Sequence, residues 1–303
     1  MDPLSDVLAL LKPKSYIVGG FDIGGPWSLR FGAYEGIKCY VVLSGHCWLA
    51  LEGVAEAPIE MQAGDCFLLP RGTPFRLAND LTLAPIEVHT YASSQRNGVI
   101  GRHNGGGDCM VAGGNFVFSG RPASFLLGVL PPVVHLRKES DRVKMRWCME
   151  QIRQELSDPQ PGGVLIAQQL VYTMLITALR LHLADVSAHR ADWLSALADK
   201  QMREAISCMH EAPAHPWTLA ALADRVHMSR TAFAVKFKAT VGTSPIGYLT
   251  HWRMLLAADL LAQPDTPISR VALAVGYQSE SAFSTAFKRV MGYAPRRYGA
   301  GAG

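Results

Sequence analysis

The sequence predicts an α+β protein with a β-rich first part, a helical middle segment and an all-α last part. Three observations lead to this prediction. Short apolar runs bounded by turn residues follow one another from Ser15 to about Phe118. From about Pro122 the apolar residues recur with helical spacing. Roughly the last hundred residues then contain one helix–turn–helix pattern twice.

Length and composition indicate a folded protein of two domains. The chain has 303 residues, of which 49% are hydrophobic, which is enough for two separate cores. No run of 18 apolar residues is free of polar or charged side chains, and the N-terminus carries Asp2 and Asp6 without a basic region. We therefore expect no membrane association and no secretory signal, and we place the protein in the cytoplasm. Residues 2–12 are expected to form a short amphipathic helix.

The β-rich part contains two recognisable turn regions. Residues 38–43 and 47–51 flank Ser44–Gly45 and are predicted to pair as a hairpin. Residues 60–74 read EMQAGDCFLLPRGTP, an apolar run between two glycine turns.

This second stretch resembles the second motif of the cupin barrels, G-x5-P-x-G-x2. The resemblance implies a jelly-roll barrel, and we expect it over residues 1–121. In metal-binding cupins the next residue is a histidine ligand, whereas this chain has Phe75. The first cupin motif, H-x-H with a glutamate, is also missing, since His46 stands alone. We therefore expect neither a metal nor another cofactor, and His89 is more simply a hydrogen-bonded structural residue.

The cysteines and one glycine-rich loop are the candidate sensing residues of this domain. The six cysteines are scattered without zinc spacing, so they are either buried reduced thiols or redox sensors. Residues 102–109, RHNGGGDC, form a loop that either closes the barrel or holds an effector with its N–H groups. The candidate effector or redox residues are Cys39, Cys47, Cys66, His103 and Cys109.

Residues 122–186 are predicted to be a helical dimerisation segment. Ser140–Leu156 begins with an N-cap serine and carries an apolar stripe that includes Val143, Trp147 and Ile152. Val164–Ala184 is so apolar that most of its sides should be buried. Either the two helices form a homodimer interface or they pack within the chain. Residues 187–198 are the expected linker to a domain at 199–303.

The last domain contains the repeated pattern. In the second copy, residues 268–298, apolar residues at helical spacing end at Gly276, which suits the left-handed C′ position. Ser279 can cap the next helix, and Gly292 and Pro295 end it. Six residues of the first copy recur 50 positions later: Ser229, Phe233, Phe237, Gly242, Pro245 and Tyr248. Two ordinary helical hairpins are the alternative.

The second copy, A-x-x-x-G-Y-x-S-x-S-x-F-x-x-x-F-K-R-x-x-G-x-x-P-x-x-Y, resembles the AraC/XylS-type transcription regulators. The resemblance implies sequence-specific binding of double-stranded DNA, a homodimer, and usually activation through RNA polymerase. It implies control of DNA binding through the first domain, by a small-molecule effector or a redox signal. Charge agrees with DNA binding, because residues 199–303 hold 12 Lys and Arg against 7 Asp and Glu.

The expected DNA contacts lie on the second helix of each copy. An 18-residue helix at Pro245–Ala262 would span about 27 Å and let both enter successive major grooves. The predicted base-reading residues are Arg230, Thr231, Ala234, Val235, Glu280, Ser281 and Thr285. The family often has arginine where this chain has Val235 and Thr285, so Arg–guanine contacts are not expected there. The predicted phosphate contacts are Ser229, Lys236, Lys238, Ser244, Ser279, Lys288, Arg289, Arg296 and Arg297, any of which could instead be a solvated charge.

The rival hypothesis is a metal-dependent cupin enzyme fused to a DNA-binding domain. Phe75 and the missing H-x-H argue against it. We therefore predict a transcription regulator that is not an enzyme.

Overall fold

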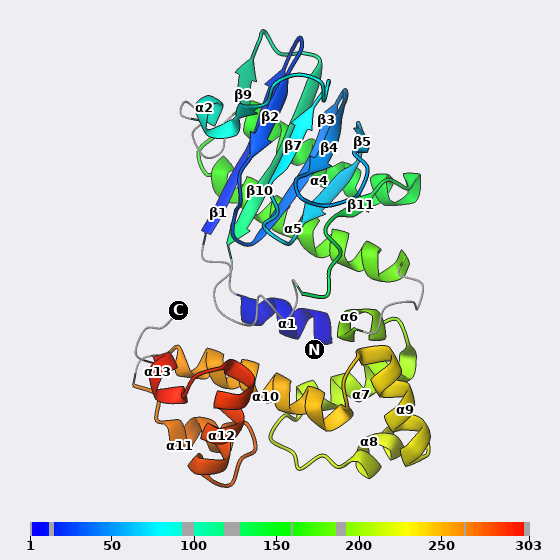
Figure 1. Ribbon diagram of the computed structural model, residues 1–303, viewed down its shortest axis with the longest axis vertical. Coiled ribbons are helices and arrows are strands. Elements are labelled where there is room, and N and C mark those ends of the chain that lie inside the picture. Colours follow the sequence, from blue (N-terminus) through cyan, green and yellow to red (C-terminus); the bar gives the residue numbers. More distant parts are fainter. Residues whose placement is uncertain are drawn as a thin grey trace. The chain divides into compact units, whose positions relative to one another are not determined.

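The computed structural model describes residues 2–11, 15–92, 100–117, 128–158, 160–185, 192–263 and 265–299. The chain divides into two compact units, one rich in strands and one helical (Figure 1). The β-rich unit comprises Pro13–Phe118 and Leu130–His182. The helical unit comprises Met1–Lys12, Ser119–Val129 and Leu183–Gly303.

Two sheets form the β-rich unit. In the described part of the chain, one sheet has six strands in the order β11-β6-β3-β10-β1-β9, and the other has five in the order β5-β4-β7-β2-β8. The strands of the first are β1 (Ser15–Ile23), β3 (Ile37–Ser44), β6 (Cys66–Leu69), β9 (Ile100–His103), β10 (Cys109–Val117) and β11 (Val134–Leu136). Those of the second are β2 (Ser28–Phe31), β4 (His46–Leu51), β5 (Ile59–Gln62), β7 (Phe75–Ala78) and β8 (Ile86–Glu87). A short helix, α2 (Val88–Ala92), follows β8.

The predicted hairpin around Ser44–Gly45 is wrong, although both of its strands exist. β3 pairs with β10 and β6, whereas β4 pairs with β5 and β7. The chain therefore passes from one sheet to the other at Gly45, which has φ of 73°. Only a residue without a Cβ fits this corner, because a Cβ would lie 1.9 Å from the carbonyl oxygen of Asp108.

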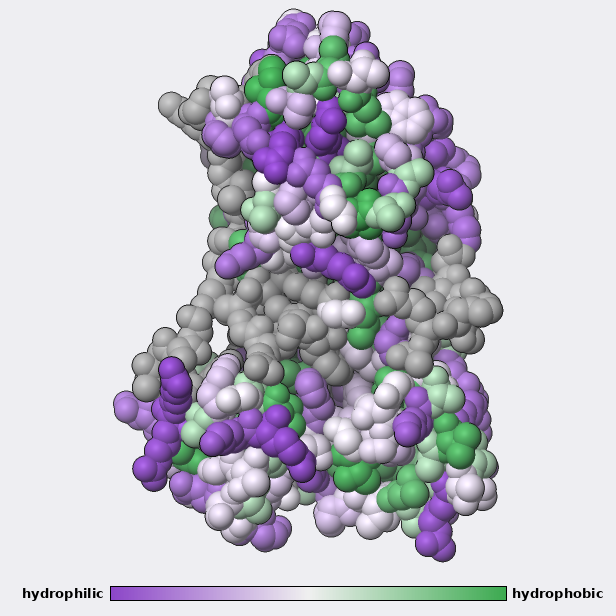
Figure 2. Space-filling view, in the orientation of Figure 1, coloured by the Kyte–Doolittle hydropathy of each residue, from purple (hydrophilic) through white to green (hydrophobic). Residues whose placement is uncertain are grey.

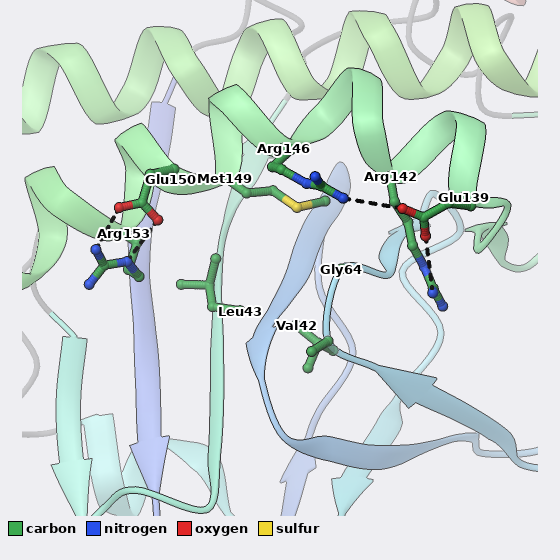
Figure 3. A pocket seen from close by; sticks show the side chains of 10 residues that line it. Val42, Leu43, Gly64, Glu139, Arg142, Arg146, Met149, Glu150 and Arg153 are labelled. Atoms are coloured by element: carbon green, nitrogen blue, oxygen red, sulfur yellow. Dashed lines mark hydrogen bonds and ion pairs between the residues drawn. The ribbon is translucent and has the colours of Figure 1, made fainter.

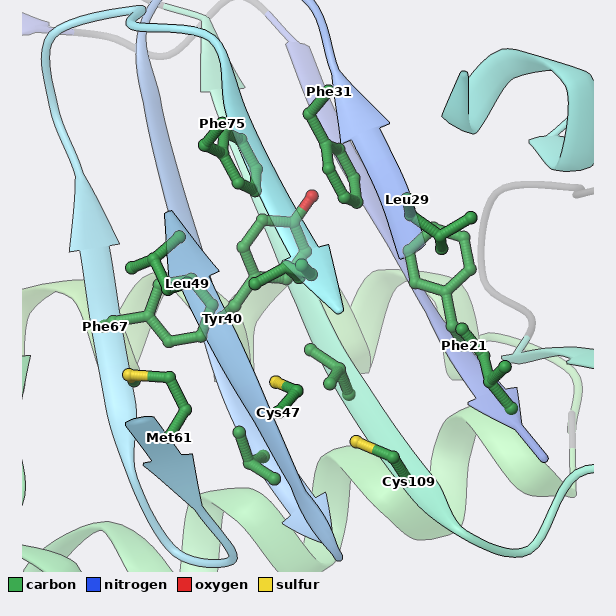
Figure 4. Packing of buried hydrophobic residues seen from close by; sticks show 14 of the residues in the cluster. Phe21, Leu29, Phe31, Tyr40, Cys47, Leu49, Met61, Phe67, Phe75 and Cys109 are labelled. Carbon is green, nitrogen blue, oxygen red and sulfur yellow. The ribbon is translucent and has the colours of Figure 1, made fainter. Parts of the chain in front are cut away.

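Apolar side chains fill the space between the two sheets. Figure 4 shows this packing, in which Phe31 stacks on Phe75 with ring centroids 4.4 Å apart. Phe75, the residue at the histidine position of metal-binding cupins, is completely buried in this cluster. A phenylalanine ring has no donor atom, so the position that supplies a histidine ligand in metal-binding cupins cannot do so in this chain.

The segment after the barrel departs from the predicted helical run in two ways. Val134–Leu136 forms β11, which pairs with β6 and extends the six-stranded sheet. The first long helix, α4 (Glu139–Ser157), starts one residue before Ser140 and has no side-chain cap. The residues of its predicted apolar stripe differ in burial, because Ile152 is buried whereas Val143 and Trp147 are 55% and 65% exposed. The predicted helical character of residues 122–127 lies outside the described residues.

The second long helix, α5 (Gly163–Asp185), forms as predicted, but it is buried along one face rather than on most of its sides. Its buried residues recur every three or four positions, from Ala167 through Val171 and Met174 to Ala178. The Tyr172 ring lies 5.9 Å from that of Phe116 on β10, so this face packs against the barrel. By length and composition alone, residues 163–184 could cross a membrane, although 44% of the apolar window is buried within the structure. Burial of this kind is typical of a core helix.

The helical unit contains the predicted repeat. Its elements are α1 (Pro3–Leu11), α6 (Trp193–Ala196), α7 (Lys200–Glu211), α8 (Leu219–Arg225), α9 (Arg230–Val241), α10 (Pro245–Leu261), α11 (Ile268–Ala274), α12 (Glu280–Met291) and α13 (Pro295–Gly299). Helices α8 and α9 form the first helix–turn–helix, and α11 and α12 form the second (Figure 1). Helix α10 connects the copies with 17 residues, about 25 Å. Helix α1 contacts α7 and α10.

Candidate nucleic-acid interface

Each copy presents one capped helix, α9 or α12, as the predicted DNA-reading helix. The Ser229 side chain accepts a hydrogen bond from the Ala232 N–H at 3.3 Å, and that of Ser279 accepts one from the Ala282 N–H at 3.2 Å. Both helices end at a left-handed glycine, Gly242 or Gly292. These local signals fix where each helix begins and ends.

The inner face of each reading helix is apolar, whereas the outer face of α12 is mostly polar and that of α9 mixes polar side chains with exposed alanines and Val235. Phe233, Phe237, Phe283 and Phe287 are completely buried. The predicted base-reading residues other than Ala234 are exposed, and Ala234 is half-buried. Figure 2 shows hydrophilic and apolar side chains interspersed over the visible surface of these helices.

Two base-reading positions have defined chemistry in the structure. The Thr285 hydroxyl donates a hydrogen bond to the Ser281 carbonyl at 3.0 Å, so its methyl group and oxygen lone pairs remain for a ligand. Val235 is 66% exposed, so its apolar side chain is accessible to a ligand. Both positions can therefore contact an apolar base edge such as the thymine methyl group.

The predicted phosphate contacts fall into two groups. Lys238, Lys288, Arg289, Arg296 and Arg297 are exposed. Lys236 differs, because its ammonium binds Asp199 and Gln201, each at 2.8 Å. This ion pair joins α9 to the N-terminus of α7, and it leaves at most one N–H of the Lys236 ammonium for a phosphate. The third predicted serine, Ser244, caps α10 by accepting from the Gly247 N–H at 3.1 Å.

Arg253, which the sequence analysis did not single out, holds the second turn in place. Its guanidinium on α10 donates to the carbonyls of Pro213 at 2.6 Å and His215 at 2.9 Å. The same group lies 5.8 Å from the Tyr277 ring, in the turn between α11 and α12. In the sequence, Arg253 could have been noticed as the single arginine within the mostly apolar residues 245–261.

His210, the second residue missed, lies buried in the core of the helical unit. Its ring stacks on Trp252 at 3.7 Å, its Nδ1 lies 3.1 Å from the Asp6 carboxylate, and its Nε2 lies 2.9 Å from the Tyr248 hydroxyl. Burial lowers the pKa of His210 below its ordinary value of 6.5, and the Asp6 hydrogen bond offsets part of this effect. No local sequence signal connects the pair, because Asp6 and His210 are 204 residues apart.

Comparison with known proteins adds the family. A cupin family matches residues 2–184, and a helix-turn-helix domain family matches residues 222–300. A putative AraC-like transcription regulator of Streptomyces lividans is 41% identical over 299 residues, covering 98% of each chain. The chain belongs to the AraC-like transcription regulators.

Other AraC-like relatives align over nearly the whole chain. The RCS-specific HTH-type transcriptional activator RclR of Escherichia coli (strain K12) is 31% identical, covering 98% of this chain and 97% of that one. Among solved structures, the DNA-binding domain of AdpA in complex with a target DNA is 31% identical over 32% of this chain and 87% of that chain, with a TM-score of 0.31. The AraC-like chain is thus a DNA-binding transcription regulator with an N-terminal cupin domain.

The cupin domain of this AraC-like regulator has a cavity of about 260 Å³ between α4 and the barrel (Figure 3). Its arginines are paired within the protein: Arg146 lies 3.1 Å from Glu139, and Arg153 binds Glu150. Arg142 binds the buried carboxylate of Asp65 at 2.7 Å, which also lies 3.1 Å from Nε2 of His135 on β11. Asp65, in the cupin-like motif, therefore links the barrel to both elements that follow it.

The other predicted sensing residues do not form one site. Cys47 and Cys109 contact each other in the barrel core, and Cys39 and Cys66 form a separate pair. His103 lies at the end of β9, where its ring is 6.2 Å from that of Phe21. Burial lowers the pKa of His103. Within the described residues, no three His, Cys, Asp or Glu side chains are grouped to hold a metal ion.

Proposed function

We propose that α9 and α12 read two segments of one DNA site through the residues predicted above. The observation that carries this proposal is the matched pair of capped helices, each with buried phenylalanines inside and exposed side chains outside. Helix α10, about 25 Å long, connects the two copies, a length comparable to the ~34 Å of one DNA turn, and this supports their entry into successive major grooves.

The two helices are expected to prefer different bases. Glu280 can accept a hydrogen bond from cytosine N4, and the apolar groups of Val235 and Thr285 can contact thymine methyls. Exposed Lys238, Lys288 and Arg289 would bind phosphates and fix the register of the helices. The serine caps satisfy one orphan N–H in each first turn and leave others for phosphate oxygens.

Selection of genomic DNA fragments by the purified full-length protein tests this proposal. The wild type should enrich one motif with two segments. The variant Glu280→Ala/Ser281→Ala/Thr285→Ala should lose only one segment, and Thr231→Ala/Val235→Ala should lose only the other, so each variant is the control for its partner. Loss of both segments with either variant would contradict independent reading by the two helices.

We further propose that the regulator is a homodimer that uses the outer face of α4 and the start of α5. Val143 and Trp147 lie one helical turn apart on α4, and Leu165 is 67% exposed on α5. Exposed apolar groups of this size on a folded domain indicate a protein interface. Trp147→Glu should turn a dimer into a monomer in analytical ultracentrifugation, whereas Lys144→Glu on the same helix should not. A wild-type monomer at micromolar concentration would refute the proposal.

We propose that the cupin domain controls transcription by shifting α4. A small molecule in the cavity of Figure 3 would contact both α4 and the barrel. It shifts the regulator between two arrangements only if it binds one of them better. Transcription in vitro with RNA polymerase, from a DNA site that the protein selects, tests whether the regulator activates. The same assay with the variant Met149→Trp, whose larger side chain would fill the cavity, tests whether the cavity controls transcription. Unchanged transcription and unchanged effector response in that variant would exclude the cavity.

The alternative of a cupin enzyme is disfavoured by the stacked Phe31 and Phe75 rings inside the barrel. We infer that the domain regulates without catalysing a reaction. Elemental analysis of the purified protein tests this, because stoichiometric iron, manganese or zinc would favour the enzyme.

A further inference from the structure

The corner between the two sheets brings two cysteines together. Gly45 lies against the start of β10, where a Cβ on Gly45 would be only 3.0 Å from the Cα of Cys109. Two residues later on β4, Cys47 points into the same core as Cys109, and the two thiols lie close together (Figure 4). The two thiols are 62 positions apart in the sequence but meet where β3 ends and β4 begins.

These two cysteines belong to different sheets. Cys47 is on β4 of the five-stranded sheet, and Cys109 is the first residue of β10 in the six-stranded sheet. A bond between them would join the sheets across the barrel core. The described sheets share no hydrogen-bonded strand pair at this corner, since β4 pairs only with β5 and β7.

The chemistry of the two thiols is unequal. The proximity of Cys47 lowers the pKa of Cys109, against the opposing effects of burial and of the Asp108 and Asp22 carboxylates. The proximity of Cys109 and burial raise the pKa of Cys47. Cys109 directly follows the loop at residues 104–108 and is 2% exposed, whereas Cys47 is completely buried, so an oxidant that enters through the loop meets Cys109 first.

A small oxidant could reach Cys109 through the adjacent loop. Four successive residues before it, Asn104 to Gly107, have positive φ values of 48°, 82°, 67° and 99°. Cys109 itself is 2% exposed, so the loop must open locally for the reaction.

Cys39 and Cys66 offer a matched contrast. Their thiols also lie close together, and both are fully buried on the six-stranded sheet. They are diagonal rather than opposite, because Cys39 faces Leu68 and Cys66 faces Val41. Diagonal Cα atoms are about 7–8 Å apart, beyond the ~4.4–6.8 Å usual for a disulfide. This second pair should therefore remain reduced.

We propose that Cys47 and Cys109 form a disulfide when a hydroperoxide oxidises the protein. The Cys109 thiolate attacks one peroxide oxygen, giving a Cys109 sulfenic acid and releasing the other oxygen as hydroxide or an alcohol. The Cys47 sulfur then attacks the Cys109 sulfur, the S–S bond forms, and the sulfenic oxygen leaves as water with the Cys47 proton. Two thiols are oxidised and one peroxide is reduced. Any effect on transcription rests on the proposed function of the cupin domain.

The test uses the reduced full-length protein treated with hydrogen peroxide and then alkylated. Chymotrypsin can cleave after Tyr40, Trp48 and Phe67, which places Cys39, Cys47 and Cys66 on separate peptides. We expect a disulfide-linked peptide pair containing Cys47 and Cys109, and a fall in free thiols from six to four. Peroxide-treated wild type without this linked pair would overturn the proposal, whatever the variants do.

Variants assign the two roles. Cys47→Ala should leave a Cys109 sulfenic acid that dimedone traps, whereas Cys109→Ala should give no dimedone adduct at Cys47. Cys39→Ala, the matched control, should form the disulfide as the wild type does. A dimedone adduct on Cys47 in the Cys109→Ala variant would overturn the assigned order of attack.

A separate measurement keeps the proposed function apart from this inference. DNA binding of the reduced wild type tests the DNA-reading proposal and does not involve the disulfide. If reduced protein fails to bind DNA while the disulfide forms, the DNA-reading proposal fails and the disulfide stands. If reduced protein binds DNA and no disulfide forms, the disulfide proposal fails and the DNA-reading proposal stands.

Discussion

The two helix–turn–helix copies share the same backbone conformation at the turn, but a different residue adopts it in each copy. Gly276, with φ of 86°, follows α11, and the corresponding residue after α8 is His227, with φ of 54°. A Cβ on Gly276 would lie 2.7 Å from the Ala214 carbonyl oxygen, so only glycine fits there. The first copy accepts a side chain in the same left-handed conformation. The required conformation is thus shared, and the neighbouring chain decides which residue can supply it.

The copies also differ in how they attach to the rest of the unit. Lys236 of α9 binds Asp199 at the start of α7, whereas the matching position of α12 is Ala286, which packs in an apolar cluster with Met254 and Leu261 of α10. The first copy is therefore held partly by charge and the second by apolar contact. Their outer faces differ as well, since Arg230 corresponds to Glu280. The repeat preserves the fold while its surface and attachments vary.

The largest change in stability is expected when one buried phenylalanine is removed from each copy. Phe237→Ala and Phe287→Ala should each lower the free energy of unfolding by about 3–5 kcal/mol, because both rings are completely buried. Urea denaturation followed by circular dichroism measures the change. A loss below about 1 kcal/mol in one copy would show that its core is not equivalent to the other.

The turn residues should respond in opposite directions. Gly276→Ala should lower the free energy of unfolding by about 2 kcal/mol or more, because it adds left-handed strain to a backbone clash. His227→Gly should raise it by up to about 1 kcal/mol, since it removes the strain without creating a clash. Thermal unfolding of the two variants beside wild type measures both. Equal effects of the same sign would contradict the assigned difference.

The lysines should separate DNA contact from internal attachment. Lys288 is exposed, so Lys288→Ala should reduce the slope of log Kd against log salt by about 0.9, as expected for one lost phosphate contact. Lys236→Ala should leave that slope unchanged and lower stability by less than about 1 kcal/mol, since its ion pair with Asp199 is partly exposed. Fluorescence anisotropy over a salt series measures the slopes. The reverse order of slopes would place Lys236 on the DNA.

The smallest expected effect on stability is that of a change in pH, and it should be confined to the first helix–turn–helix copy. Because burial lowers the pKa of His210, the unfolded chain takes up a proton near pH 6.5 before the folded chain does. The stability that depends on neutral His210 is therefore complete above pH 6.5 and decreases as pH falls towards the folded-state pKa.

Hydrogen exchange with mass spectrometry can follow each copy separately. On acidification, protection of α7 and α9 should fall before that of α11 and α12. His210→Gln should make this difference insensitive to pH. Equal loss in both copies, or a difference that persists in the variant, would contradict the role of His210.

The sequence predicted the helical unit more accurately than the barrel, for a physical reason. The caps Ser229, Ser244 and Ser279 act on backbone groups two or three residues away, so local sequence was enough to place α9, α10 and α12. β3 pairs with β6 and with β10, the latter some 70 residues later, so the predicted hairpin with the adjacent β4 was wrong. Periodicity identified α4 as a helix, but it did not show which of its apolar residues pack within the domain: Ile152 is buried, whereas Val143 and Trp147 are exposed.

The sequence was enough to predict which residues of the candidate DNA interface are exposed. It was not enough to predict the contacts that hold the helices of the interface in place. The exposure of α9 and α12 residues follows from the spacing of the phenylalanines. The ion pair of Lys236, the anchoring of Arg253 and the burial of His210 depend on residues far along the chain. Long-range contacts of this kind leave no periodic trace in the sequence.

The position of α1 makes the helical unit discontinuous in the sequence. Leu4, Val7 and Leu8 are buried within this unit, and the Asp6 carboxylate reaches His210, although the barrel strands separate α1 from α7 along the chain. In topological terms, the barrel is an insertion into the helical unit. A fragment cut at the start of α6 would therefore lose part of its own core and expose an apolar patch on α7 and α10. Adding residues 2–11 as a separate peptide should restore the stability of such a fragment, since the two pieces complement one another like halves of a split protein.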